Sequence, residues 1–140
     1  MIQAISDKIK AELETLKGTN KPLVNVYDFH TLENTWYPYV SFEAVELTWE
    51  IRDTCNNERT IIYDLYIFQE IGTQGRQVAT QIIYKAMDDI MDLFDKNYTL
   101  DWVVELITPI WWNIIPFNIW NGSALVWNLK LECRYNRFIW

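Results

Sequence analysis

The segment ALVWNLKLECRY, residues 124–135, decides the architecture, because its apolar and polar side chains alternate with the period of a β-strand. One face carries Leu125, Trp127, Leu129, Leu131, Cys133 and Tyr135. The opposite face carries Asn128, Lys130, Glu132 and Arg134. A strand of this kind belongs to a sheet that is packed on one side only. The sequence therefore predicts a sheet whose other side meets solvent or a partner.

A hairpin is predicted upstream of this strand, with its two strands at residues 39–50 and 61–70. In the first strand, the apolar residues change from one face to the other midway, near Ala44-Val45. A β-bulge there would reconcile the two halves, and so would a strand whose two faces meet different partners. The second strand of the hairpin is apolar on both faces, which predicts a central strand covered on both sides. The connection between the two strands, residues 53–60, is predicted to be a polar turn.

Two segments have helical periodicity. A narrow apolar stripe runs along residues 2–16 and ends before Gly18, and a wider stripe runs along residues 77–96. Short strands are predicted at residues 23–29 and 102–107. The element order α-β-β-β-α-β-β predicts an α+β fold, in which a mostly antiparallel sheet has two main helices packed on it. Residues 1–140 are predicted to form a single domain.

The segment IWWNIIPFNIW, residues 110–120, is apolar and aromatic, yet fits neither a helix nor a clean strand. Its proline removes a backbone donor, and two asparagines interrupt the run. We expect a long connection between the two closing strands. Such a surface either folds back on its own core or is covered by another molecule. Its aromatic residues are candidate core seals or candidate interface anchors: Trp111, Trp112, Phe117 and Trp120.

The formal net charge of −7 argues against non-specific binding to nucleic acid phosphates and against a basic membrane-binding helix. No apolar run approaches the roughly 20 residues that span a bilayer, and the first residues do not have the layout of a signal peptide. We expect a soluble protein made in a cytoplasm, with no membrane partner. In that setting Cys55 and Cys133 are expected to be free thiols.

The sequence contains no motif that specifies a reaction. His30 is the one histidine, and the expected role is that of a surface loop residue, with catalysis as the alternative. One histidine and two separated cysteines do not make a usual zinc site, and residues 71–76 lack the phosphate-loop pattern. No catalytic residue, metal or cofactor is predicted.

An acidic cluster marks the second predicted helix. Asp88, Asp92 and Asp95 share one side of this helix, at a small cost in like-charge repulsion. A solvated face is the ordinary interpretation. An acidic surface that faces a partner or a lumen is the functional one, and a divalent-cation site is a third.

The layout resembles the tail-terminator (tail-completion or neck) proteins of long-tailed bacteriophages over residues 2–135. A helix and a strand precede Trp36-Tyr37-Pro38-Tyr39-Val40, which leads into the hairpin. The hairpin ends at Phe68-Gln69-Glu70, before a second helix and two closing strands. The long tryptophan-rich connection departs from this pattern. No functional residue can be carried over from the family by motif.

The resemblance implies a structural virion protein, assembled in the host cytoplasm, that forms a homo-oligomeric ring, usually a hexamer. Such a ring binds the tail-tube protein, stops its polymerisation and offers a face to a head–tail connector. DNA would pass through it without specific binding, which favours an acidic lumen. Two further contact regions are predicted from polarity: the hairpin tip with Asn56 and Asn57, and the strand face with Lys130, Glu132 and Arg134.

Two alternatives stay open at this point. Another neck or head-completion connector would share the setting and the ring. A small intracellular enzyme or ligand-binding domain with an aromatic pocket would instead need polar groups that converge in that pocket.

Overall fold

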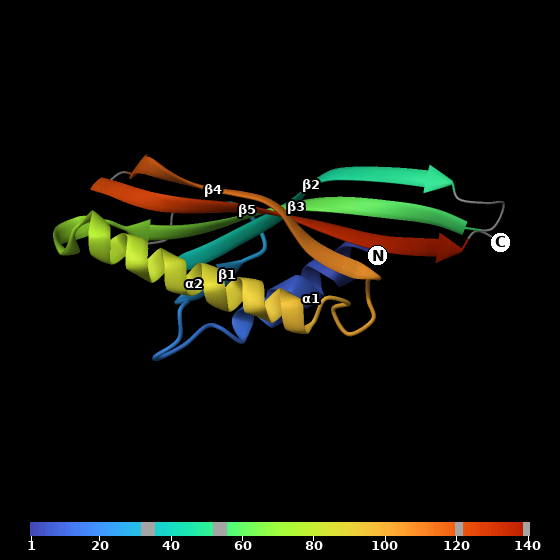
Figure 1. Ribbon diagram of the computed structural model, residues 1–140, viewed down its shortest axis with the longest axis horizontal. Helices are drawn as coiled ribbons and strands as arrows, with labels where there is room; N and C mark the ends of the chain where they lie inside the picture. Colours follow the sequence, from blue (N-terminus) through green and yellow to red (C-terminus); the bar gives the residue numbers. More distant parts are fainter. Residues whose placement is uncertain (32–35, 52–55, 120–121, 139–140) are drawn as a thin grey trace.

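A computed structural model of the chain describes residues 1–31, 36–51, 56–119 and 122–138. Both helices lie on the same side of a five-stranded sheet, so the fold has two layers (Figure 1). A short 3-10 turn (η1, Gly72–Gln74) is the one element added to the predicted order α-β-β-β-α-β-β. The predicted α+β class is therefore confirmed.

The sheet has the strand order β1-β2-β3-β5-β4 and is antiparallel except where β1 pairs with β2. β3 is central, as predicted, but the helices cover only one of its faces. On the face toward the helices, Ile61, Tyr63, Leu65 and Ile67 are fully buried, whereas Ile62 and Tyr66 on the other face are half-buried. The strands are β1 (Asn25–Tyr27), β2 (Tyr39–Ile51), β3 (Asn56–Glu70), β4 (Leu106–Ile119) and β5 (Gly122–Phe138).

The main core lies between the sheet and the two helices, α1 (Ile2–Glu14) and α2 (Arg76–Lys96). Each helix buries one stripe, as its periodicity predicts. The predicted alternation of β5 is also confirmed, because its apolar positions from Leu125 to Tyr135 are buried under the helices. The buried helical residues are Ile5, Ile9, Leu13, Ala79, Ile83, Ala86, Ile90 and Phe94.

A smaller aromatic cluster covers one end of the face that has no helix. Tyr39 and Phe68 stack there with ring centroids 4.8 Å apart, and Val126 packs beside them. Tyr27, Tyr37 and Tyr66 surround the cluster. The Tyr37-Pro38-Tyr39 segment therefore places its two tyrosines on the helix-free face, at the start of β2.

The parity change in β2 is produced by a bulge, the first of the two predicted explanations. The register with β3 shifts between Ala44 and Glu46. Phe42 therefore faces the helices before the bulge, and Leu47 faces the same side after it. Beyond the bulge, β2, β3 and β5 continue past the ends of the helices (Figure 1). We call this extension, residues 46–51, 56–61 and 133–138, the arm; at its base, Ile61, Cys133 and Tyr135 still belong to the core beneath the helices.

Some predicted boundaries are wrong. Residues 56–60 begin β3 instead of forming a turn, because their backbone pairs with β5 on one side and, from Asn57 on, with β2 on the other. Residues 102–105 form a turn instead of a strand, and β4 begins at Leu106. The strand predicted at 23–29 is shorter, Asn25–Tyr27.

Candidate functional site

Residues 110–119 of the predicted connection form most of an edge strand. β4 pairs with β5 on one side, and no described strand pairs with its other side. An edge strand tolerates proline, because a backbone N–H that points away from the sheet is not needed for pairing. Pro109 and Pro116 both lie in β4, and a register shift follows Pro109. The proline and the interrupted alternation, which suggested a loop, are therefore features of an edge strand.

The aromatic residues of β4 are divided between the two faces of the sheet. Trp111 lies opposite Lys130 on the helix-free face, and Trp112 lies opposite Leu129 on the helix side. The two tryptophans are 45% and 53% exposed, so they do not seal the core. Phe117 is placed only by its backbone, opposite Ala124, and Trp120 lies outside the described residues. The segment was expected either to seal the core or to contact another molecule. The exposure of its two described tryptophans favours the contact.

A second open edge lies on the arm. β1 covers β2 only at Tyr39–Ser41, so no described strand pairs with this side of β2 beyond Ser41. The arm carries an apolar stripe on its helix side, made of Leu47, Trp49 and Ile51, the last two 67% and 69% exposed. The predicted tip residue Asn57 lies in β3 and is buried, whereas of Asn56 only the strand position is described. The arm therefore presents its stripe, and Asn57 is not part of the exposed surface.

The exposed charges of β5 have partners within the chain. Lys130 Nζ lies 2.7 Å from Asp64 Oδ1 on β3 and 5.9 Å from the Trp111 ring centroid. Arg134 Nε lies 2.6 Å from Glu132 Oε1. These pairs argue against the prediction that Lys130, Glu132 and Arg134 form ion pairs with a neighbour.

The turn between α2 and β4 is strained, which sequence reasoning missed. Leu100, Asp101 and Trp102 have φ values of 47°, 57° and 70°, a left-handed conformation that costs L-residues roughly 1–2 kcal/mol each. The turn contains no glycine that could have signalled it. Buried Leu100 holds the turn from within, and the Trp102 side chain is 85% exposed.

Polar contacts brace the same turn. Asp101 Oδ2 lies 2.6 Å from Lys8 Nζ of α1, and the Asp101 N–H donates to Asn97 Oδ1 at 3.0 Å. Asn97 Nδ2 donates to Glu12 Oε1, and the Trp102 N–H donates to Thr99 Oγ1 at 3.3 Å. The Lys8 ammonium lowers the pKa of the Asp101 carboxyl, and Asp101 raises the pKa of Lys8 in return. The surroundings therefore fix a backbone conformation that the residues themselves disfavour.

His30 lies in a polar cluster at the helix-free face. Its Nδ1 is 3.1 Å from Ser41 Oγ, and its backbone N–H donates to Glu43 Oε1 at 2.7 Å. The imidazole packs edge-on against the Tyr66 ring, with centroids 4.7 Å apart. Ser41 is fully buried, so its hydroxyl cannot reach a substrate carbonyl in this arrangement. The cluster fixes the loop before β2 against the sheet.

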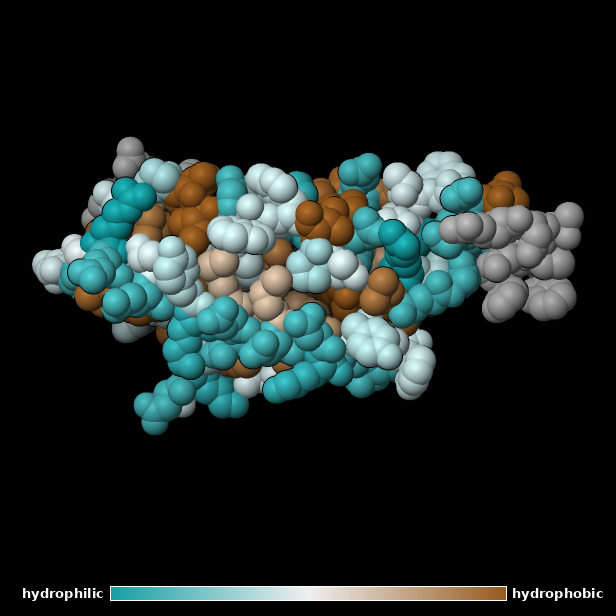
Figure 2. Space-filling model, in the orientation of Figure 1, coloured by the Kyte–Doolittle hydropathy of each residue, from teal (hydrophilic) through white to brown (hydrophobic). Residues whose placement is uncertain are grey.

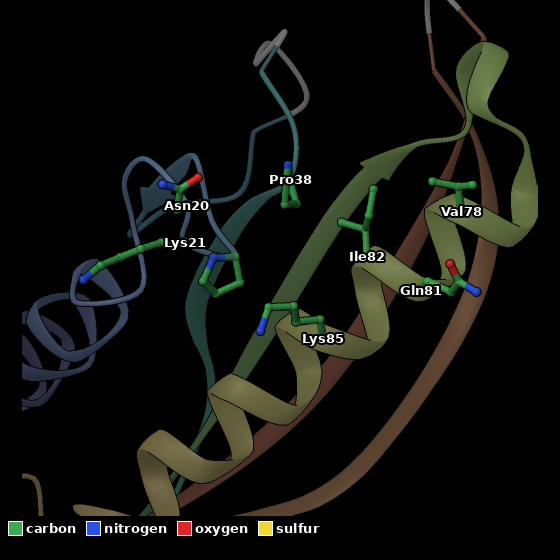
Figure 3. A pocket seen from close by; sticks show the side chains of 8 residues that line it. Asn20, Lys21, Pro38, Val78, Gln81, Ile82 and Lys85 are labelled. Carbon is green, nitrogen blue, oxygen red and sulfur yellow. The ribbon is translucent and has the colours of Figure 1, made fainter.

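A shallow groove lies between α2 and the loops that carry Pro22 and Pro38 (Figure 3). Its volume is about 390 Å³, and its floor is apolar. Lys21 and Lys85 stand at its rim, but Lys21 Nζ donates to the Thr15 carbonyl and Lys85 Nζ lies 3.5 Å from Asp89. No carboxylate, histidine or cysteine lines this groove within the described chain, so it lacks the convergent groups of an active site.

The acidic cluster lies on the solvent side of α2. Asp88, Asp92 and Asp95 are all exposed, and Figure 2 shows hydrophilic surface over this helix. Within the described residues, no group of three histidine, cysteine or carboxylate side chains could hold a metal ion. Of the three predicted alternatives, the metal site therefore has no support in the geometry, and a solvated or partner-facing surface remains.

Cys133 is a buried free thiol of β5, and burial raises its pKa to about 12. Cys55 lies outside the described residues. Among the described helices, none is both long and apolar enough to cross a membrane.

No protein-family model matches the chain, and no curated protein matches its sequence. The candidate site is therefore defined by geometry alone. It consists of the β4 edge, the free edge of β2 on the arm, and the braced turn that presents Trp102.

Proposed function

We propose that the chain is a structural virion assembly protein of the tail-terminator kind, which closes into a ring by pairing β4 of one subunit with the free edge of β2 in the next. The observation that carries this proposal is that one sheet has two open edges of different character. A contact between two different edges is heterologous, and repetition of such a contact closes a ring when the rotation permits.

Strand direction fits this pairing. β2, β3, β5 and β4 alternate in direction across the sheet, so β2 and β4 run in opposite directions. A neighbouring copy related by rotation about an axis along the strands would thus add its β2 antiparallel to β4. Backbone hydrogen bonds would then continue the sheet from subunit to subunit.

Charge also favours pairing between different edges. Residues 106–129, which include all of β4, carry no charged side chain. The free part of β2 carries Glu43, Glu46 and Glu50 on the helix-free face. A twofold pairing of two β2 edges would bring these glutamates together, whereas β4 offers them uncharged neighbours.

The same closure supports a channel lined by the helix-free face. A helix with its side chains is about 10 Å thick, so a ring with its helices inside would have its channel obstructed. Within the described strands, the helix-free face carries seven acidic residues and two basic ones, and both basic side chains are paired. The acidic residues are Glu43, Glu46, Glu50, Glu58, Asp64, Glu70 and Glu132. In this proposal Asp88, Asp92 and Asp95 lie on the outside of the ring, where a tail-tube or head–tail connector protein could meet them.

The decisive measurement is the mass of the assembled species by light scattering, together with electron microscopy of the particles. We expect a ring, a hexamer by the resemblance, that binds the end of a tail tube. Trp112→Lys should prevent assembly without unfolding the monomer, because a charge at an exposed edge position opposes strand pairing. Trp36→Lys changes another exposed tryptophan, which lies beside Gln69 and Gln74 and belongs to neither edge strand, and should leave assembly unchanged. A chain that stays monomeric at high concentration and binds no tube would contradict the proposal.

A further inference from the structure

We propose that Trp102 is the anchor by which each subunit grips the next, and that its receptor is the apolar stripe Leu47, Trp49 and Ile51 on the arm of the neighbouring copy. This inference rests on the edge-to-edge ring proposed above. It adds a side-chain contact beyond backbone pairing, and it assigns a role to a turn that the fold itself does not require to be strained.

The first argument is the conformation of the turn. A tryptophan with φ of 70° is a true outlier among L-residues, and here it follows two other left-handed residues. The contacts of Asp101 with Lys8 and Asn97 hold the backbone in this state. Strain that the surroundings maintain in this way is characteristic of functional segments. The turn thereby presents an indole that is 85% exposed.

The second argument is the position of the turn relative to the β4 edge. The Ile107 N–H donates to the Tyr98 carbonyl at 2.7 Å, and the Glu105 N–H donates to the Arg134 carbonyl at 2.8 Å. The turn is therefore attached to the first residues of β4. Leu100 and Val104 belong to the core beneath the helices, so the turn lies on the helix side of the sheet.

The third argument comes from the strand register. Leu106, Arg134, Thr60 and Thr48 form one row across β4, β5, β3 and β2. When rows align across the subunit contact, Thr48 of the next copy lies level with Leu106. Leu47 and Trp49 of that copy then lie on the helix side, next to the turn that carries Trp102. An exposed tryptophan and an exposed apolar stripe would cover each other, as anchor and pocket residues do in interfaces.

The test compares self-association of the full chain with that of Trp102→Ala and Trp102→Gly, by sedimentation. We expect both variants to weaken association at least about tenfold, as loss of an interface anchor does. Trp36→Ala is the matched control and should stay within about twofold of wild type, because Trp36 is exposed but precedes the part of β2 that β1 covers, outside the proposed contact. Glycine relieves the strain at this φ, so at concentrations low enough to dissociate both proteins Trp102→Gly should have a Tm equal to or above that of wild type, although it assembles less well at high concentration. A merely structural role of Trp102 would lower the Tm.

A double-mutant cycle identifies the receptor. Trp49→Ala should also weaken association, and the combination with Trp102→Ala should cost less than the product of the two single effects, because both remove the same contact. Independent effects would overturn the assignment of the stripe as receptor. If the Trp102 variants assemble like wild type while Trp112→Lys does not, the anchor is refuted and the ring stands. If wild type is monomeric throughout, both proposals fail.

Discussion

The hydroxyl of Tyr63 lies 2.9 Å from Ser6 Oγ, which joins the central strand to the first helix across 57 positions of the chain. Tyr63 is fully buried beneath α1, and its hydroxyl also donates to the Ile2 carbonyl at 3.3 Å. Burial raises the pKa of this phenol to about 12, so the hydroxyl is protonated at neutral pH and can donate. The contact fixes α1 on the sheet at the base of the arm.

Tyr63→Phe should lower the free energy of unfolding by about 1 kcal/mol, because the ring is retained and only the hydroxyl contacts are lost. For a domain of this length this corresponds to a fall in Tm of about 2–4 °C. Thermal unfolding followed by circular dichroism measures it. Tyr84→Phe, at an exposed site on α2, is the control and should not shift the Tm. Equal Tm values for the two variants would mean that the Ser6 contact adds nothing.

The layered core was predictable because its signal is periodicity. Apolar residues mark the buried side of each element, as a stripe along α1 and α2 and as every second residue of β5. In β2 the apolar residues change face at the bulge. β4 was not recognised, because an edge strand can contain prolines, and a register shift at Pro109/Trp111 disturbs its alternation. The local sequence of a strand does not show whether it pairs with one neighbouring strand or with two.

The candidate site was only partly predictable, for a related reason. Trp111 and Trp112 stood out by residue type alone, and their exposure supports the contact reading. The stripe on the arm looked like core, since only the tertiary structure shows that β2 continues past the ends of the helices and that Leu47 and Trp49 are exposed. Trp102 gave no signal, because its left-handed turn is imposed by contacts with Lys8 and Asn97 from other elements.

The Lys8–Asp101 pair should make stability depend on pH at the acidic end. Lys8 lowers the pKa of Asp101 below its ordinary 3.8, first by a hydrogen bond and then by charge. A carboxyl with a lowered folded-state pKa stabilises the protein above its unfolded-state pKa, and this contribution is lost as the pH falls through the folded-state value. Asp101→Asn should therefore lower the Tm at about pH 6 and flatten its decline toward about pH 3. Added salt should reduce the difference, because the pair is exposed.

The control for that experiment is Asp95→Asn, which changes an exposed carboxylate of α2 that has no ion pair among the described residues. It should leave the acid dependence of the Tm close to that of wild type. If Asp95→Asn and Asp101→Asn change the profile equally, net charge and not the pair with Lys8 governs the acid response.

Cys133 should resist thiol reagents in the folded protein. Its side chain is fully buried in β5, and burial raises its pKa to about 12, so almost no reactive thiolate forms at neutral pH. In a Cys55→Ser background, labelling with a chromogenic disulfide reagent should be slow in buffer and complete in denaturant. Rapid labelling of the folded protein would show that β5 opens on the timescale of the reaction.

Salt should strengthen self-association. Each subunit carries a net charge of −7, and β4, the proposed contact strand, has no charge with which to attract a neighbour. Ions therefore screen repulsion without weakening an attraction, and association measured by sedimentation should tighten between about 50 and 500 mM NaCl. Glu46→Gln should tighten association at low salt, because Glu46 lies on the free edge of β2. Glu14→Gln on α1 is the control for charge alone and should do less. The opposite trend, weaker association at high salt, would point to intersubunit ion pairs through residues such as Lys130, Glu132 and Arg134.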